Sequence, residues 1–161
     1  MISELLSRAF RRNQRLIHTQ ADGLTQEESL AQTEYNVNCF NWVLGHIVSS
    51  RGNILELLGA EAVMTSEQAE KYLRESDPIT EDGPGVLSFG ELLALLDTTE
   101  TALEEALSAA DDKFLAEEIP VGDERTASRA AQVMFWYFHD TYHTGQTDIL
   151  RQLSGRSDKI V

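Results

Sequence analysis

The chain has 161 residues, a length that suits one domain spanning residues 1–161 with an apolar core. Its apolar fraction of 42% and aromatic fraction of 7% are typical of a globular protein and argue against disorder. The net charge of -14, from 13 basic and 27 acidic residues, opposes binding to nucleic acid or to an anionic lipid surface.

The chain has no uninterrupted apolar stretch of the length that a membrane span needs, and charged residues interrupt the N-terminal MISELLSRAFRRNQRL from its start. We therefore expect a cytoplasmic protein without a membrane partner. The single cysteine, Cys39, lies in the apolar run NCFNWVL and cannot form an intrachain disulfide. We interpret Cys39 as a small core residue rather than a reactive nucleophile.

The first predicted helix covers about residues 3–20, because apolar residues such as Leu6 recur there at helical spacing. Gly23 follows as a stop signal. Thr25 and Glu28 then form a capping-box pattern, in which a hydroxyl precedes a carboxylate by three residues. This pattern predicts a short helical turn before the second long helix.

The second predicted helix covers about residues 36–58 and ends before Gly59, which suits a C-terminal cap. Residues 60–87 make a long connection, in which we expect a short helix at about residues 67–74. All of the prolines lie between the predicted long helices, as helix-breaking residues should: Pro78, Pro84 and Pro120.

The third predicted helix covers about residues 89–110 and is opened by a second capping box, from Ser88 to Glu91. The fourth covers about residues 127–153. No segment shows sustained alternation of apolar and polar residues, so no strand is expected. The predicted fold class is therefore all-α, a four-helix bundle whose second connection is a long crossover.

Two histidines of the fourth predicted helix are candidates for metal ligands. His139 and His143 are four residues apart, so a helix places both rings on one face, one turn apart. The stripe that contains them continues through Gln146 and Leu150, so we expect the two rings to face the bundle core. The alternative is that this spacing arose by chance, since it is common on helices.

His46 lies on the apolar stripe of the second predicted helix, together with polar residues that include Asn53. Burial of several polar groups is unfavourable unless something satisfies them, and a metal ion with its water would do so. The alternative is a core histidine that hydrogen bonds within the protein. His18 has no companion at a useful spacing, and we do not place it at the site.

Two sequence stretches together resemble signatures of the DinB superfamily of four-helix metalloproteins. In NCFNWVLGHIV the resemblance rests on the five residues Asn38, Trp42, Leu44, Gly45 and His46. In HDTYHTGQTDILRQL it rests on the six residues His139, Asp140, Tyr142, His143, Gly145 and Gln146.

The resemblance implies that His46, His139 and His143 hold one divalent metal ion, commonly nickel or zinc, in a protein that forms homodimers. It also implies a possible activity, because some members of the superfamily are transferases that use a low-molecular-weight thiol such as bacillithiol or mycothiol. A small-molecule substrate and a thiol cosubstrate are therefore expected partners.

Three histidine ligands leave a divalent ion with an open position, which is typical of catalytic rather than structural sites. Three functions remain open: transfer of a thiol, metal-assisted hydrolysis, and a non-catalytic bundle that the metal stabilises. Asp140 follows His139 as the glutamate of HExxH proteases follows a histidine, but a solvent-facing or histidine-orienting role is favoured. Gln146 and Asn53 are further candidates for contacts to the ligands or the substrate, whereas Tyr142 is expected to pack.

Overall fold

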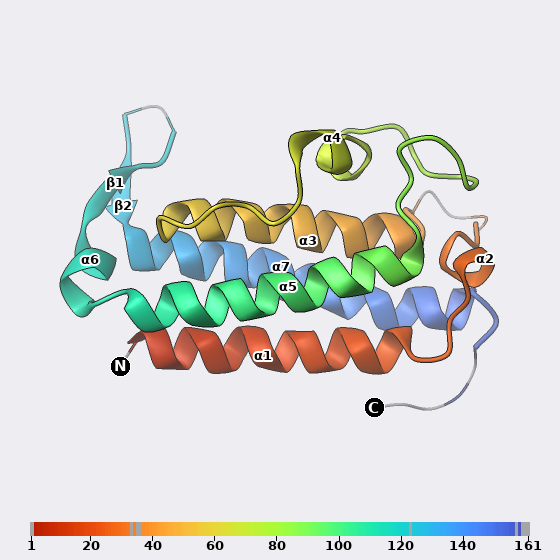
Figure 1. The fold of residues 1–161 in the computed structure, drawn as a ribbon, viewed down its shortest axis with the longest axis horizontal. Helices are drawn as coiled ribbons and strands as arrows, with labels where there is room; N and C mark the ends of the chain where they lie inside the picture. Colours follow the sequence, from red (N-terminus) through yellow and green to blue (C-terminus); the bar gives the residue numbers. More distant parts are fainter. Residues whose placement is uncertain (1, 33, 35–36, 123, 157, 159–161) are drawn as a thin grey trace.

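The computed structural model describes residues 2–32, 34, 37–122, 124–156 and 158. The predicted all-α class is confirmed, because four long helices make up most of the described chain (Figure 1). They are α1 (Ile2–Ala21), α3 (Phe40–Leu57), α5 (Phe89–Ala109) and α7 (Arg129–Leu153).

The four helices pack in a ring, in which α3 contacts α5 and α7, and α1 contacts the same two helices from the other side. In Figure 1, α1 and α7 run in one direction while α3 and α5 run in the other. Because α3 and α5 are parallel neighbours, residues 58–88 must return along the length of the bundle. The expected long second crossover is therefore present, and it lies on the outer side of α3.

Short elements complete the fold. Helix α2 (Gln26–Ser29) has the predicted capping box at Thr25, and Ser88 caps α5 in the same way. The crossover contains α4 (Ser66–Ala69) and the 3-10 helix η1 (Glu70–Tyr72) in place of one helix over residues 67–74. The chain leaves η1 at Leu73, whose backbone is extended, so the predicted helix is too long at its C-terminal end.

Two predicted helix starts are corrected by the observed caps. Helix α3 begins at Phe40, with Cys39 as its N-cap, and not near residue 36, which lies outside the described residues. Helix α7 begins at Arg129, because the Ser128 side chain accepts a hydrogen bond from the Ala131 amide. A serine in this position stabilises the first turn of a helix.

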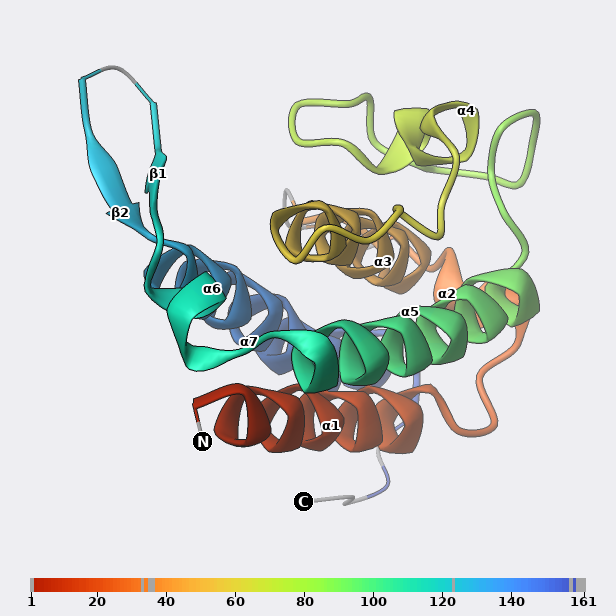
Figure 2. The same cartoon turned by 60° about the vertical axis from the view of Figure 1, so that its left-hand side comes forward.

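The connection between α5 and α7 contains strands that the sequence did not predict. After α6 (Asp112–Ala116), β1 (Glu118–Pro120) pairs antiparallel with β2 (Thr126–Ser128), with Ile119 opposite Ala127. Strands of three residues are too short to show alternation in a sequence. Figure 2 shows this hairpin extending away from the bundle, so it forms no wall of the helical core.

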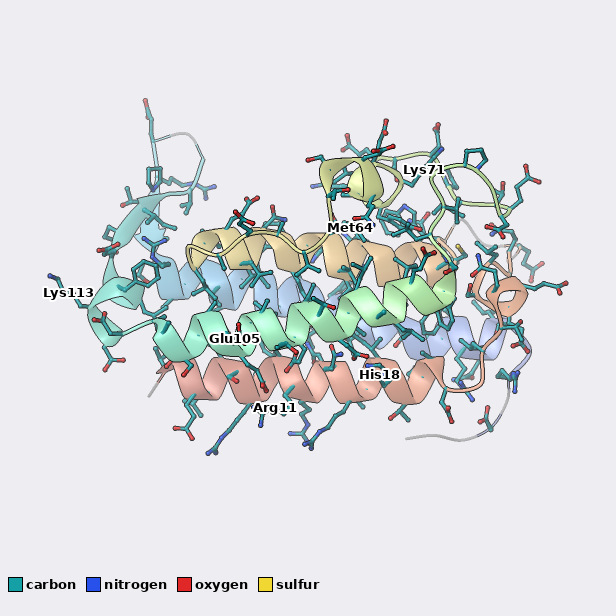
Figure 3. All side chains as sticks on the ribbon, in the orientation of Figure 1. Arg11, His18, Met64, Lys71, Glu105 and Lys113 are labelled. Atoms are coloured by element: carbon teal, nitrogen blue, oxygen red, sulfur yellow. The ribbon has the colours of Figure 1, made fainter. Side chains whose placement is uncertain are left out.

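The bundle interior is apolar at both ends and polar in the middle. Two clusters of buried apolar side chains occupy the ends, with Leu44 and Leu92 in one and Leu55 and Leu103 in the other. Figure 3 shows side chains filling the space between the helices, whereas Lys113 on α6 extends into solvent. Among the described residues, no helix combines the length and apolar character needed to cross a membrane.

Cys39 is buried, as the sequence predicted, and its thiol lies 3.5 Å from the carbonyl oxygen of Ile79. Burial raises the pKa of the Cys39 thiol, which keeps it protonated at neutral pH. This environment is that of a core residue.

Candidate metal site

His46 is held in one orientation by the crossover. Its Nδ1–H donates a hydrogen bond of 2.6 Å to the backbone carbonyl oxygen of Tyr72. A carbonyl oxygen can only accept, so this contact places the proton on Nδ1 and leaves Nε2 with a free lone pair. The indole ring of Trp42 stacks on the imidazole, with centroids 4.6 Å apart and planes at 14°. His46 therefore presents Nε2 towards α7.

His143 is oriented in the same way from within α7. Its Nδ1–H donates to Oε1 of Gln146 over 2.6 Å, so its Nε2 is also free to bind. Gln146 was expected near the site, and this contact is the one that a ligand-orienting residue makes. His139 Nε2 lies 3.3 Å from His46 Nε2, and His139 Nδ1 is buried without a hydrogen-bond partner among the described residues.

The three imidazoles meet at one point between α3 and α7. One ligand nitrogen from each of His46, His139 and His143 lies within 4.8 Å of the other two. Two nitrogens that each lie about 2.0–2.1 Å from a tetrahedral zinc ion are separated by about 3.3–3.4 Å. The observed separation of 3.3 Å between the His46 and His139 nitrogens matches this value. The donor set therefore fits a divalent ion such as zinc or nickel.

The expectation that the histidine stripe is the core face of the last helix is wrong. The buried line of α7 instead runs through Val133, Asp140, Thr144 and Thr147. His139 and His143 lie beside this line and are partly exposed. The site is consequently at the edge of the bundle, in reach of solvent, rather than sealed inside it.

Asp140 neither faces solvent nor orients a histidine by a direct hydrogen bond. Its side chain is 2% exposed, and it accepts hydrogen bonds from Arg51 Nε at 2.8 Å and Asn13 Nδ2 at 2.7 Å. Asn53 is exposed on α3, so its expected inward orientation is also wrong. Asp140 acts on the site through its charge alone, which opposes the lowering of the pKa values of His139 and His143.

Arg51, which no sequence motif singled out, lies at the centre of the polar middle of the bundle. Arg51 is fully buried, and its Nη1 donates to Oε1 of Gln14 over 2.7 Å. A signal for it exists in the sequence, because Arg51 continues the inward stripe of Leu44, Ile47 and Ile54 at spacings of three and four. A charged residue on that stripe predicts a buried ion pair.

A pocket of about 410 Å³ opens over the three imidazoles. Besides the histidines, aromatic rings and one arginine line it: Trp42, Arg74, Phe135, Phe138 and Tyr142. Tyr142 was expected to pack in the bundle, but it is 60% exposed and forms part of this lining. A larger groove of about 870 Å³, between α1 and α5, is lined mostly by polar side chains such as Arg11 and Glu104. Of these two pockets, the one over the histidines combines candidate metal ligands with apolar walls.

Burial keeps the three histidines neutral. Desolvation, followed by the neighbouring His143 and His46, lowers the pKa of His139 to about 4. Desolvation also lowers the pKa values of His46 and His143. Neutral imidazole is the form that binds metal, so the site is ready to accept an ion at pH 7 without first losing protons.

The low pKa of His139 predicts that the metal-free protein loses stability in mild acid. Between pH 6.5, the ordinary value, and about pH 4, the unfolded chain binds a proton at this residue that the folded chain does not. Protonation therefore favours unfolding, and stability falls as the pH decreases through this window. Urea unfolding midpoints of wild type and His139→Gln at pH 7.5 and 5.5 test this. If the midpoint falls by the same amount in both proteins between pH 7.5 and 5.5, His139 is not the source of the loss and the prediction is contradicted.

The Gln146 contact predicts a role in metal affinity. We expect Gln146→Leu to weaken zinc binding about tenfold, because the His143 ring loses the acceptor that orients it. Gln152→Leu on the same helix is the control, since the Gln152 side chain is exposed and donates to Asp148 rather than to a histidine. Competition with a chromophoric chelator measures both affinities. Unchanged affinity of Gln146→Leu would exclude an orienting role.

Comparison with known proteins agrees with this architecture. The family model described as DinB superfamily matches residues 9–147. A solved structure, described as the conserved protein of locus from Enterococcus faecalis, has a similar fold, with a TM-score of 0.75 at 16% sequence identity. The similarity covers 94% of this chain and 96% of that one. A search of curated proteins found no match.

Proposed function

The chain belongs to the DinB superfamily, and on that premise we propose that it is a metal-dependent enzyme whose divalent ion is held by His46, His139 and His143. The observation that carries this proposal is the gathering of one ring nitrogen from each of His46, His139 and His143 within 4.8 Å of one another, beside a pocket that all three residues line. Three protein ligands would leave a divalent ion with an open position, whereas a structural site is normally closed by a fourth protein ligand.

The favoured reaction is transfer of a low-molecular-weight thiol to an electrophile. A divalent ion at the site would supply Lewis acidity that lowers the pKa of a coordinated thiol or water. The aromatic rings of Phe135, Phe138 and Trp42 would exclude water and hold an apolar electrophile beside the thiol. Arg74 at the same pocket would pair with an anionic group on either substrate.

Metal-assisted hydrolysis is less well supported, because hydrolases of the HExxH type place a carboxylate as general base beside the attacking water. None of the described residues that line the pocket is a carboxylate. Asp140, the nearest candidate in the sequence, is buried and engaged by Arg51 and Asn13. Thiol activation needs less help from the protein, since a free thiol has a pKa of about 8.5, whereas that of bulk water is about 15.7.

The function is tested by assaying the metal-loaded protein with small thiols, including cysteine and glutathione, and with 1-chloro-2,4-dinitrobenzene as electrophile. A parallel set of nitrophenyl esters and anilides tests hydrolysis. His143→Ala, expected to lose metal, is the control for turnover by protein-bound metal. Metal-dependent thiol consumption supports the proposal. Ester or anilide turnover alone would favour a hydrolase, and turnover in neither set would favour a non-catalytic metal-stabilised bundle.

The identity of the native ion as nickel or zinc, the homodimeric state and the cytoplasmic location stay predictions. Elemental analysis of the freshly purified protein tests the first, and light scattering of the metal-loaded protein tests the second.

A further inference from the structure

A backbone group of the crossover contacts one of the three histidines directly. The carbonyl oxygen of Tyr72, at the end of η1, accepts the hydrogen bond from His46 Nδ1 at 2.6 Å. This contact joins residues that lie 26 positions apart in the sequence. The orientation of a ligand on α3 therefore depends on where the crossover places one peptide group.

Gly45 determines how closely that peptide can approach α3. A Cβ built on Gly45 would lie 2.1 Å from Cδ1 of Tyr72 and 2.5 Å from its Cγ. Atoms at these distances overlap strongly, and the ring is fully buried, so it has no free space to move into. The ring of Tyr72 can occupy its position only because residue 45 has no side chain.

The other end of the Tyr72 ring is fixed by hydrogen bonds. The Tyr72 hydroxyl donates to Asn41 Oδ1 at 3.2 Å and accepts from the Leu87 amide at 2.8 Å. Asn41 Nδ2 also donates to the Leu87 carbonyl oxygen at 2.9 Å. Desolvation raises the pKa of Tyr72 to about 12, so the hydroxyl keeps the proton that it donates. The ring thus lies between the backbone of Gly45 and two polar anchors.

We propose that Tyr72 and Gly45 are positioning residues of the metal site: Gly45 seats the Tyr72 ring, and the seated residue holds the His46 imidazole through its backbone carbonyl. The inference rests on the proposed metal binding by His46. It does not depend on which reaction the metal supports. The crossover would thereby help to hold His46 in place. A second contact acts in the same sense, because Ser76 of the crossover accepts a hydrogen bond of 2.9 Å from Nε1 of Trp42, the residue that stacks on His46.

The substitution Gly45→Ala tests the proposal. Alanine at a mid-helix position ordinarily stabilises a helix relative to glycine, so a loss of function must come from displacement of Tyr72. We expect zinc affinity to fall about tenfold or more, as for loss of a ligand-orienting contact. Gly52→Ala is the matched control, because Gly52 also lies on α3 and is buried, but an added Cβ there would lie 3.0 Å from Cβ of Ala62 and 3.9 Å from its Cα, and would not meet Tyr72.

A second readout follows the hydrogen bond itself. In the metal-loaded wild type, the proton on His46 Nδ1 should give a downfield resonance in the proton NMR spectrum of nitrogen-15-labelled protein. This proton should exchange slowly with solvent. We expect Gly45→Ala to weaken or abolish that resonance and Gly52→Ala to keep it. If Gly45→Ala proves too unstable to purify, Tyr72→Ala replaces it, since it leaves Gly45 unchanged. We expect Tyr72→Ala to lose both the resonance and the zinc affinity as well.

The outcomes separate this inference from the proposed function. If wild type binds zinc and Gly45→Ala binds it equally tightly with an unchanged His46 resonance, the positioning role is excluded. An equal loss of affinity in Gly52→Ala would also exclude it, because the effect would then be general to the helix. If wild type itself binds no divalent ion, the proposed function fails, and the resonance in metal-free protein still decides whether Gly45 and Tyr72 hold His46.

Discussion

Replacing His46, His139 or His143 with alanine is expected to reduce bound metal about tenfold or more in each case. The three nitrogens are mutually close, so each substitution removes one of three protein ligands from a single ion. Elemental analysis after dialysis against a metal buffer gives the stoichiometry. Each of these substitutions should lower metal binding more than Gln146→Leu does. The histidine variants remove a metal ligand, whereas Gln146→Leu removes only the group that orients one.

His18→Ala is the control for this series. His18 lies on α1 and its Nε2 is 2.6 Å from an Asp97 carboxylate oxygen on α5, in the position that Figure 3 labels. The substitution removes a histidine without touching the three-histidine cluster. It should leave metal content unchanged. Metal content like that of wild type in any of the three ligand variants would remove that histidine from the site.

Asp140→Ala is expected to destabilise the protein by about 3–5 kcal/mol, the cost of leaving a buried charge without its partner. Arg51 would keep contacts with Gln14 and Thr99 but lose its close carboxylate. Glu100 cannot replace Asp140 without movement, because its nearest oxygen lies 3.7 Å from Arg51 Nη1. Burial also raises the pKa of Glu100, which disfavours its charged form. Urea unfolding of the metal-free protein measures the loss.

The surface pair of Arg8 and Glu4 is the matched control for Asp140→Ala. Its side chains are more than half exposed, so Glu4→Ala should change stability by less than about 1 kcal/mol. Metal-free protein is used for both variants because Asp140 adjoins His139 in the sequence. A loss in Asp140→Ala as small as that in Glu4→Ala would show that the buried network does not stabilise the bundle.

The bundle and the histidine pair could be predicted because they depend on local periodicity. A spacing of four residues fixes the relation of His139 to His143 within one helix, whatever surrounds it. The direction in which that helix faces is set by its neighbours. Helix α7 contacts both α1 and α3, so Asp140 faces the middle of the bundle while the histidines face its edge. The sequence pattern could not distinguish these two faces, since both carry polar residues.

The support of His46 could not be predicted for a different reason. The Tyr72 carbonyl is a backbone group, so no side-chain type marks it in the sequence. Its approach depends on the path of the crossover over Gly45, which is a tertiary contact. The local signal in the sequence for this contact is Gly45. A glycine inside a long helix lowers helix propensity, so its presence indicates that another segment packs closely against the helix there.

A crystal structure of the zinc-loaded protein, with anomalous scattering recorded at the zinc edge, tests most directly whether the three imidazoles share one ion. We predict a single anomalous peak about 2.0–2.1 Å from Nε2 of His46, His139 and His143, with its remaining position open to the pocket. A peak bound by fewer than three of these nitrogens, or no peak between α3 and α7, would contradict this account.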